Sequence, residues 1–145
     1  MSTRTIHTES SLFFINFTCF DWLPLFQLTS TYNAAYKWFV YLKEKRDIKT
    51  TAYVIMPNHL HCILFFPSPN FSLNKIIGNA KRFMAYEIIE SLQATNQTKI
   101  LDQLASAVTA KERSKGQKHK VFEESFGARV WIIKSSFYRN SITFI

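Results

Sequence analysis

Residues 51–66 read TAYVIMPNHLHCILFF, and this stretch decides the fold. Its two halves, residues 51–56 and 59–66, are rich in β-branched and aromatic side chains, which is typical of β-strands. Pro57 and Asn58 lie between the two halves. Proline presets a turn dihedral angle and asparagine tolerates left-handed backbone conformations, so this pair favours a tight turn. The stretch therefore predicts a β-hairpin.

Segments on both sides of the hairpin supply the remaining elements. Residues 10–20 are rich in aromatic and β-branched types and predict a strand, whereas residues 31–46 carry apolar side chains at helical spacing. Ser72 is a suitable N-cap for a helix that runs to about residue 92, and a second short helix is expected over 98–108. The order strand, helix, strand, strand, helix predicts an α+β fold whose antiparallel sheet carries helices on one face.

Composition and charge narrow the class of protein. A chain of 145 residues with 47% apolar content suits one globular domain, residues 1–145, and excludes disorder for most of its length. The net charge of +8 indicates a polyanionic partner, and nucleic acid is the usual one, although many soluble proteins are basic without such a partner. Five Lys or Arg against one Glu make residues 109–120 an expected exposed basic loop.

Cysteine usage and the lack of targeting signals indicate the compartment. Cys19 and Cys62 lie in apolar, strand-like runs, where buried free thiols are expected. Residues 1–10 have no apolar stretch of the kind found in signal peptides. No apolar run reaches the roughly 18 residues that span a bilayer. We therefore expect a cytoplasmic protein without a membrane partner.

His59 and His61 are the most informative residues of the hairpin. Side chains two residues apart on a strand project to the same face, so both imidazoles are expected to lie close enough to share one cation. Leu60, Cys62 and Leu64 are expected to face the helices. Two imidazoles can hold Mg²⁺, Mn²⁺ or Zn²⁺, depending on the other ligands. The alternative is a pair of solvated histidines on an exposed sheet face.

The string YVIMPNHLH, residues 53–61, resembles the signature of the single-tyrosine HUH transposases, including the REP-associated kind. All nine positions match with conservative differences only. Residues 13–26 are similar to the first strand and turn of that family, and residues 73–89 are similar to its second long helix, with Lys81 at a matching lysine. The resemblance implies a ferredoxin-like fold that binds single-stranded, hairpin-bearing DNA, commonly as a homodimer.

The same resemblance implies a covalent phosphoryl transfer. In that family a tyrosine oxygen attacks a DNA phosphodiester, which leaves a 5′-phosphotyrosine and a free 3′-OH that a later step can rejoin to another strand. His59 and His61 match the two histidines that hold a divalent metal, Mg or Mn, on the scissile phosphate. The metal orients that phosphate and neutralises charge on its oxygens.

Basic side chains on the long helix are candidate DNA contacts. Lys75, Lys81 and Arg82 are available for phosphate contacts, with Tyr86 beside them for stacking on a base. The alternative is an ordinary solvated helix face. The basic residues of 109–120 are a further candidate, and a flexible tether is the alternative there.

The C-terminal stretch departs from the family pattern. The position matched to the nucleophile is Phe144, which has no hydroxyl group, and a rival alignment through Trp131 places the nucleophile still further along. Tyr138 is the nearest tyrosine, but on a helix it would face about 240° away from the matched position. Tyr138 is therefore either the nucleophile or a packed aromatic side chain.

These observations leave three functions open. The preferred hypothesis is a domain for DNA transposition that is truncated, inactivated or decayed, and that keeps metal and DNA binding although cleavage is lost. The second is a non-catalytic DNA-binding module of the same lineage. The third is a zinc hydrolase, which would need a third ligand beside the two histidines; His7 and His119 are the other histidines of the chain.

Overall fold

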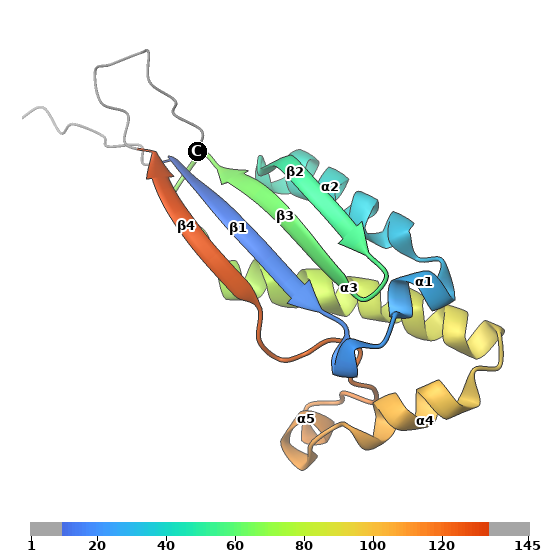
Figure 1. Ribbon diagram of the computed structural model, residues 1–145. Coiled ribbons are helices and arrows are strands. Elements are labelled where there is room, and N and C mark those ends of the chain that lie inside the picture. The colour runs from blue at the N-terminus through green and yellow to red at the C-terminus, as the bar shows by residue number, and fades with distance from the viewer. Residues whose placement is uncertain (1–9, 134–145) are drawn as a thin grey trace, which may run out of the picture.

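The computed structural model describes residues 10–133 (Figure 1). Its elements in chain order are β1 (Ser10–Thr18), the 3-10 helix η1 (Phe20–Trp22), α1 (Leu25–Thr29), α2 (Tyr32–Arg46), β2 (Lys49–Met56), β3 (His59–Phe66), α3 (Leu73–Ala94), α4 (Thr98–Ser106), α5 (Ala110–Ser114) and β4 (Gly127–Ile133). The strands form one antiparallel sheet in the order β2-β3-β1-β4. The predicted α+β class is confirmed, and this strand order is the one expected for a ferredoxin-like sheet.

The helices cover one face of this sheet. Figure 1 shows α2 and α3 side by side behind the strands, while the other face is free of helices in the described part of the chain. We call these the covered face and the open face. Alternation along β3 defines them, because Leu60, Cys62 and Leu64 are buried against the helices. The apolar stripe of α3 packs on the same core: Ile76, Ile77, Ala80, Met84, Ile88 and Leu92.

The hairpin has the predicted form. Pro57 and Asn58 link β2 to β3, and Met56 is paired with His59 directly across the turn. The predicted N-cap of α3 is also present, because the Ser72 hydroxyl accepts a hydrogen bond from the Lys75 amide at 3.4 Å. Both features follow from local sequence, and both fix where the strands and helices meet.

The segment predicted as a basic loop contains a short helix. The Thr109 hydroxyl accepts from the Glu112 amide at 3.1 Å, and the Glu112 carboxylate accepts from the Thr109 amide at 3.1 Å. This reciprocal capping box satisfies two backbone donors at the start of α5. The prediction of a loop over 109–120 is therefore wrong for Ala110–Ser114.

β4 was not predicted, and it completes the sheet on the free side of β1. The residues after β4 and before β1 lie outside the described range. Tyr138, Phe144 and His7 are among them, so the roles considered for these three residues remain predictions.

The two cysteines confirm the expected free thiols. Cys19 and Cys62 are both buried and unpaired in the structure. Burial raises the pKa of each thiol to about 12, so neither is a reactive thiolate near neutral pH. No helix among residues 10–133 combines the length and the apolar character that a membrane crossing needs.

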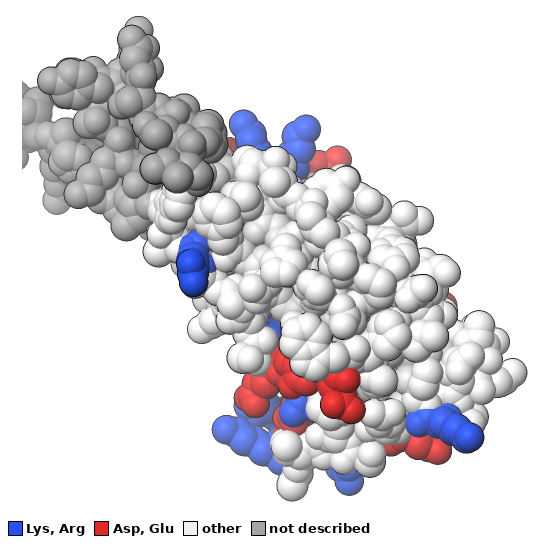
Figure 2. Space-filling view, viewed as in Figure 1, with Lys and Arg blue, Asp and Glu red and all other residues white. Residues whose placement is uncertain are grey.

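Charge is distributed unevenly over the surface. Figure 2, which shows the molecule from the side of the open face, is mostly uncharged over the sheet, with acidic and basic side chains gathered near its lower end. Many of the exposed basic residues belong to helices that cover the other face, such as Lys43, Lys45 and Arg46 in the last turn of α2. The open face is therefore largely apolar and uncharged.

Candidate metal and nucleic-acid site on the open face

His59 and His61 lie side by side on the open face, as the spacing predicted. Their ring centroids are 4.8 Å apart, and the ring planes meet at 83°. His61 is exposed and His59 is half-buried. The flanking Leu60 and Cys62 point into the core instead. Strand alternation therefore delivers two imidazoles to one patch of the surface.

Asn58 fixes the orientation of the His59 ring. Its amide nitrogen donates to the Trp22 carbonyl oxygen at 3.4 Å, which turns its Oδ1 toward Nδ1 of His59 at 2.7 Å. Because Oδ1 can only accept, Nδ1 carries the proton in this hydrogen bond. The neutral ring then keeps Nε2 as a free lone pair, which is the arrangement that a metal-binding imidazole has when a second residue orients it.

The protonation state of His59 also suits a cation. Burial, followed by the nearby His61, lowers the pKa of the His59 imidazole below its usual value of 6.5. Both causes disfavour the charged ring. Near neutral pH the ring is therefore neutral, which is the form that binds metal ions.

The two histidines fit a divalent cation as a partial ligand set. Within residues 10–133 no group of three or more His, Cys, Asp or Glu side chains is placed to hold a metal ion. Among the described residues, His59 and His61 are the side chains that would hold such a cation, and its other positions would be open to water or to oxygens of a bound molecule. Open positions of this kind belong to metal sites that act on a substrate, whereas structural sites are closed by protein ligands.

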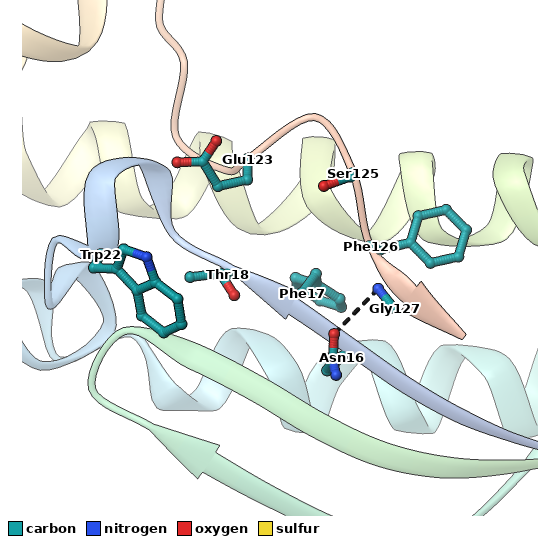
Figure 3. Close-up of a pocket in the computed structure, with 8 residues that line it drawn as sticks. All are labelled: Asn16, Phe17, Thr18, Trp22, Glu123, Ser125, Phe126 and Gly127. Atoms are coloured by element: carbon teal, nitrogen blue, oxygen red, sulfur yellow. Dashed lines mark hydrogen bonds between the residues drawn. The ribbon is translucent and has the colours of Figure 1, made fainter. Parts of the chain in front are cut away.

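Two shallow hollows flank this patch. A groove of about 550 Å³ runs across the open face, and its lining includes Phe14, Asn16, Val54, His61, Ile63 and Arg129. A smaller hollow of about 200 Å³ lies between the end of β1 and the segment that leads into β4, as Figure 3 shows. Asn16 and Gly127 line both hollows, so the two adjoin at these residues.

Trp22 stands beside His59 with most of its indole in solvent. Trp22 is 63% exposed, and the centroid of its indole lies 6.1 Å from that of the His59 ring in an edge-on arrangement. Trp22 and Asp21 both have positive φ angles, 54° and 52°, which non-glycine residues rarely adopt. The Asp21 amide donates to the Glu123 carboxylate at 2.8 Å, and the Trp22 carbonyl oxygen holds Asn58. These contacts hold a large aromatic surface at the edge of the site.

Sequence reasoning missed Asn16 and Trp22 as members of this patch. Asn16 is exposed in the middle of an aromatic strand, so the alternation of β1 could have marked it. The position of Trp22 depends on the turn after β1 and on the distant Glu123, and no local pattern encodes that contact.

The basic residues predicted to contact DNA are not gathered at the histidines. Lys75 and Arg82 are exposed on α3, on the covered side of the sheet. Lys81 is partly buried, and its ammonium group donates to the carbonyl oxygens of three consecutive residues, Glu123 to Ser125, at 2.8, 3.3 and 3.1 Å. The predicted DNA contacts of these three side chains remain predictions.

Lys81 also lies against two aromatic rings. Its Nζ is 5.9 Å from the centroid of Phe17 and 5.6 Å from that of Phe126. Burial lowers the pKa of this ammonium group to about 8, although the nearby Glu123 and Glu124 counteract part of the shift. The contacts tie α3 to the segment that leads into β4 and so help to shape the smaller hollow.

Comparison with known proteins shows a distant likeness to a solved structure. No protein-family model matches the chain, and no curated protein matches it. A solved structure of a REP-associated tyrosine transposase bound to a REP hairpin is similar in backbone, with a TM-score of 0.48 and 15% sequence identity. The likeness covers 94% of this chain and 64% of that one, so this chain spans less than two thirds of the length of that protein.

Proposed function

We propose that this protein binds single-stranded or hairpin DNA across its open face, with a divalent cation held by His59 and His61. The observation that carries the proposal is the pair of imidazoles 4.8 Å apart on the open face, one of them oriented by Asn58. The motif that contains them resembles the single-tyrosine HUH transposase signature, which directs the proposal to DNA transposition. Magnesium or manganese is the expected metal.

The chemistry of the patch supports this substrate class. A divalent cation bound there supplies charge that neutralises phosphate oxygens and orients a phosphodiester. The exposed indole of Trp22 offers a stacking surface for a base, as in proteins that bind single strands. Duplex DNA keeps its bases stacked on each other and cannot use such a surface. A preference for single-stranded over duplex DNA follows.

The binding test compares matched histidine variants. We expect a fluorescent hairpin-bearing single strand to bind in the presence of Mn²⁺ and to bind at least tenfold more weakly in His59→Ala or His61→Ala. Loss of Mn²⁺ binding without DNA, measured by calorimetry, should accompany this change. Asn33→Ala is the control, because Asn33 is exposed on α2, away from the two histidines. Equal binding by all four proteins would refute the proposal.

Cleavage and rejoining through a phosphotyrosine is a separate part of the proposal. By resemblance the nucleophile position is Phe144, so we expect the 145-residue chain to bind the labelled strand without forming a covalent adduct. Denaturing electrophoresis after incubation with Mn²⁺ tests this expectation. A protein-sized labelled band that disappears in Tyr138→Phe would instead identify Tyr138 as the nucleophile and the protein as an active transposase.

The remaining expectations concern assembly and the alternative metal. Analytical ultracentrifugation with and without DNA tests the homodimer that the resemblance implies. A zinc hydrolase would need a third protein ligand beside His59 and His61, and His7 and His119 are the other histidines of the chain. Hydrolysis of a chromogenic ester in the presence of Zn²⁺, lost in His59→Ala, would favour that alternative over the DNA-binding function proposed here.

A further inference from the structure

Asn16 is a polar side chain of β1 that stands directly opposite His61. In the antiparallel pairing of β1 with β3, Asn16 and His61 are Cα partners. Residues directly opposed on neighbouring strands project to the same face, with Cβ atoms about 5 Å apart. Asn16 is exposed on that face. Its carboxamide therefore lies beside the imidazole that the proposed function uses.

The neighbouring strand fixes one end of this carboxamide. The Gly127 amide donates to Oδ1 of Asn16 at 3.1 Å. Figure 3 shows this hydrogen bond, with the amide nitrogen of Asn16 turned away from Gly127. None of residues 10–133 accepts a hydrogen bond from that nitrogen, so within this part of the chain both N–H groups of Nδ2 are open to a ligand. The side chain is oriented before any ligand arrives.

Gly127 leaves the space that the carboxamide occupies. A Cβ atom on residue 127 would lie 2.9 Å from both Cγ and Nδ2 of Asn16, which is too close for either atom. Gly127 does not have a positive φ angle, unlike Gly116. The lack of a side chain on Gly127, and not its backbone freedom, therefore gives the carboxamide room in this orientation. Any other residue there would displace the Asn16 carboxamide.

The donor pair stands where the two hollows meet. Asn16 lines both the groove that contains His61 and the smaller hollow that contains Trp22. A single strand that stacks on Trp22 and continues into the groove that contains His61 would pass this side chain. A neutral amide suits this place, because a lysine or arginine so close to a divalent cation would be repelled by it.

We propose that Asn16 is a DNA-contacting residue, whose Nδ2 donates to a phosphate oxygen of the bound strand beside the cation at His59 and His61. This inference rests on the function proposed above and adds a specific protein contact to it. Gly127 acts through Asn16 and is a positioning residue. A phosphate oxygen suits this contact, because it accepts hydrogen bonds without donating any and carries negative charge.

The decisive variant is Asn16→Asp. It has the same shape and keeps an oxygen for the Gly127 amide, but it replaces the two donors with a negatively charged acceptor. We expect the dissociation constant for the hairpin strand to rise at least about tenfold at saturating Mn²⁺, as for the loss of a hydrogen bond to a charged group. Mn²⁺ binding without DNA should not weaken, because the added carboxylate attracts cations.

A second variant, at Gly127, tests the same contact without changing the chemical groups of Asn16. Gly127→Ala should weaken DNA binding by displacing the carboxamide, and its effect should not add to that of Asn16→Asp in the double variant, because both remove one contact. Thermal melting of each protein checks that the fold is kept. If Asn16→Asp fails to fold, Gly127→Ala alone decides the outcome.

The control is Asn33→Asp, the same charge change at an exposed position of α2. DNA binding by Asn16→Asp within twofold of wild type, or an equal loss in Asn33→Asp, would overturn the inference. Weaker Mn²⁺ binding without DNA in Asn16→Ala, which removes the carboxamide, would also overturn it, because Asn16 would then be a metal ligand. If the wild-type chain binds no DNA, the proposed function fails as well; if it binds and Asn16→Asp binds equally, only this inference fails.

Discussion

The two faces of the sheet are built from alternate residues of the same strands, yet they differ in kind. On β3 the covered face receives Leu60, Cys62 and Leu64, each at most 3% exposed. The open face receives His59 and His61 from the same strand, with Ile63 beyond them. A shift of one residue in register would exchange the two sets. The hydrophobic core and the candidate site are therefore specified by a single register.

This difference separates stability from function. Residues of the covered face contribute burial of apolar surface, which is the main stabilising term in folding. Residues of the open face contribute little burial and are free to carry chemistry. Substitutions on the two faces should thus affect different measurements.

The largest expected effect is a loss of stability on the covered face. Leu64 is fully buried, so Leu64→Ala removes buried apolar surface and leaves a cavity. We expect the free energy of unfolding to fall by about 2–5 kcal/mol in urea denaturation. His61→Ala, on the same strand but exposed, should change it by less than about 0.5 kcal/mol. If both variants lose a similar amount of unfolding free energy, the two faces do not differ in their contribution to stability.

An intermediate effect is expected from aromatic residues on the open side. Trp22→Ala should weaken binding of a single strand by about 1–3 kcal/mol if a base stacks on the indole, which is at least about fivefold in the dissociation constant. Trp22→Phe should retain much of the binding. Phe83, 60% exposed on α3 behind the sheet, is the matched control. If Phe83→Ala weakens binding as much as Trp22→Ala, the DNA does not select the open face.

The smallest expected effect concerns Lys81, a basic group enclosed between α3 and the segment before β4. Its pKa is lowered from 10.5 to about 8, so between these pH values the unfolded chain binds more protons than the folded one. The free energy of unfolding of the wild type, relative to Lys81→Met, should therefore rise as pH increases from 8 to 10.5, with a slope below about one proton.

Urea denaturation of both proteins at several pH values measures this difference, and the contributions of the two cysteines cancel in it. A fall with increasing pH would mean that the three carbonyl oxygens stabilise the ammonium group more than burial penalises it.

Features carried by short segments were predictable from the sequence. The hairpin, the Ser72 cap and the shared face of the two histidines each depend on residues within a few positions of one another. β4 was not predictable in this way, because it pairs with β1, which is far away in the sequence. Gly127, for example, is the partner of Asn16. The contacts of Lys81 depend in the same way on residues 123–125, so its spacing on α3 did not reveal where its ammonium group lies.

The uneven placement of charge has a kinetic consequence. Exposed basic side chains of the helices, such as those in the last turn of α2, act on an approaching polyanion through the long-range field of the whole protein, which salt screens over about 8–10 Å. The contacts proposed on the open face are short-ranged and are made after arrival. Added salt should therefore slow association with DNA much more than it hastens dissociation, so that the lifetime of the complex reports on the open face and its rate of formation reports on the rest of the molecule.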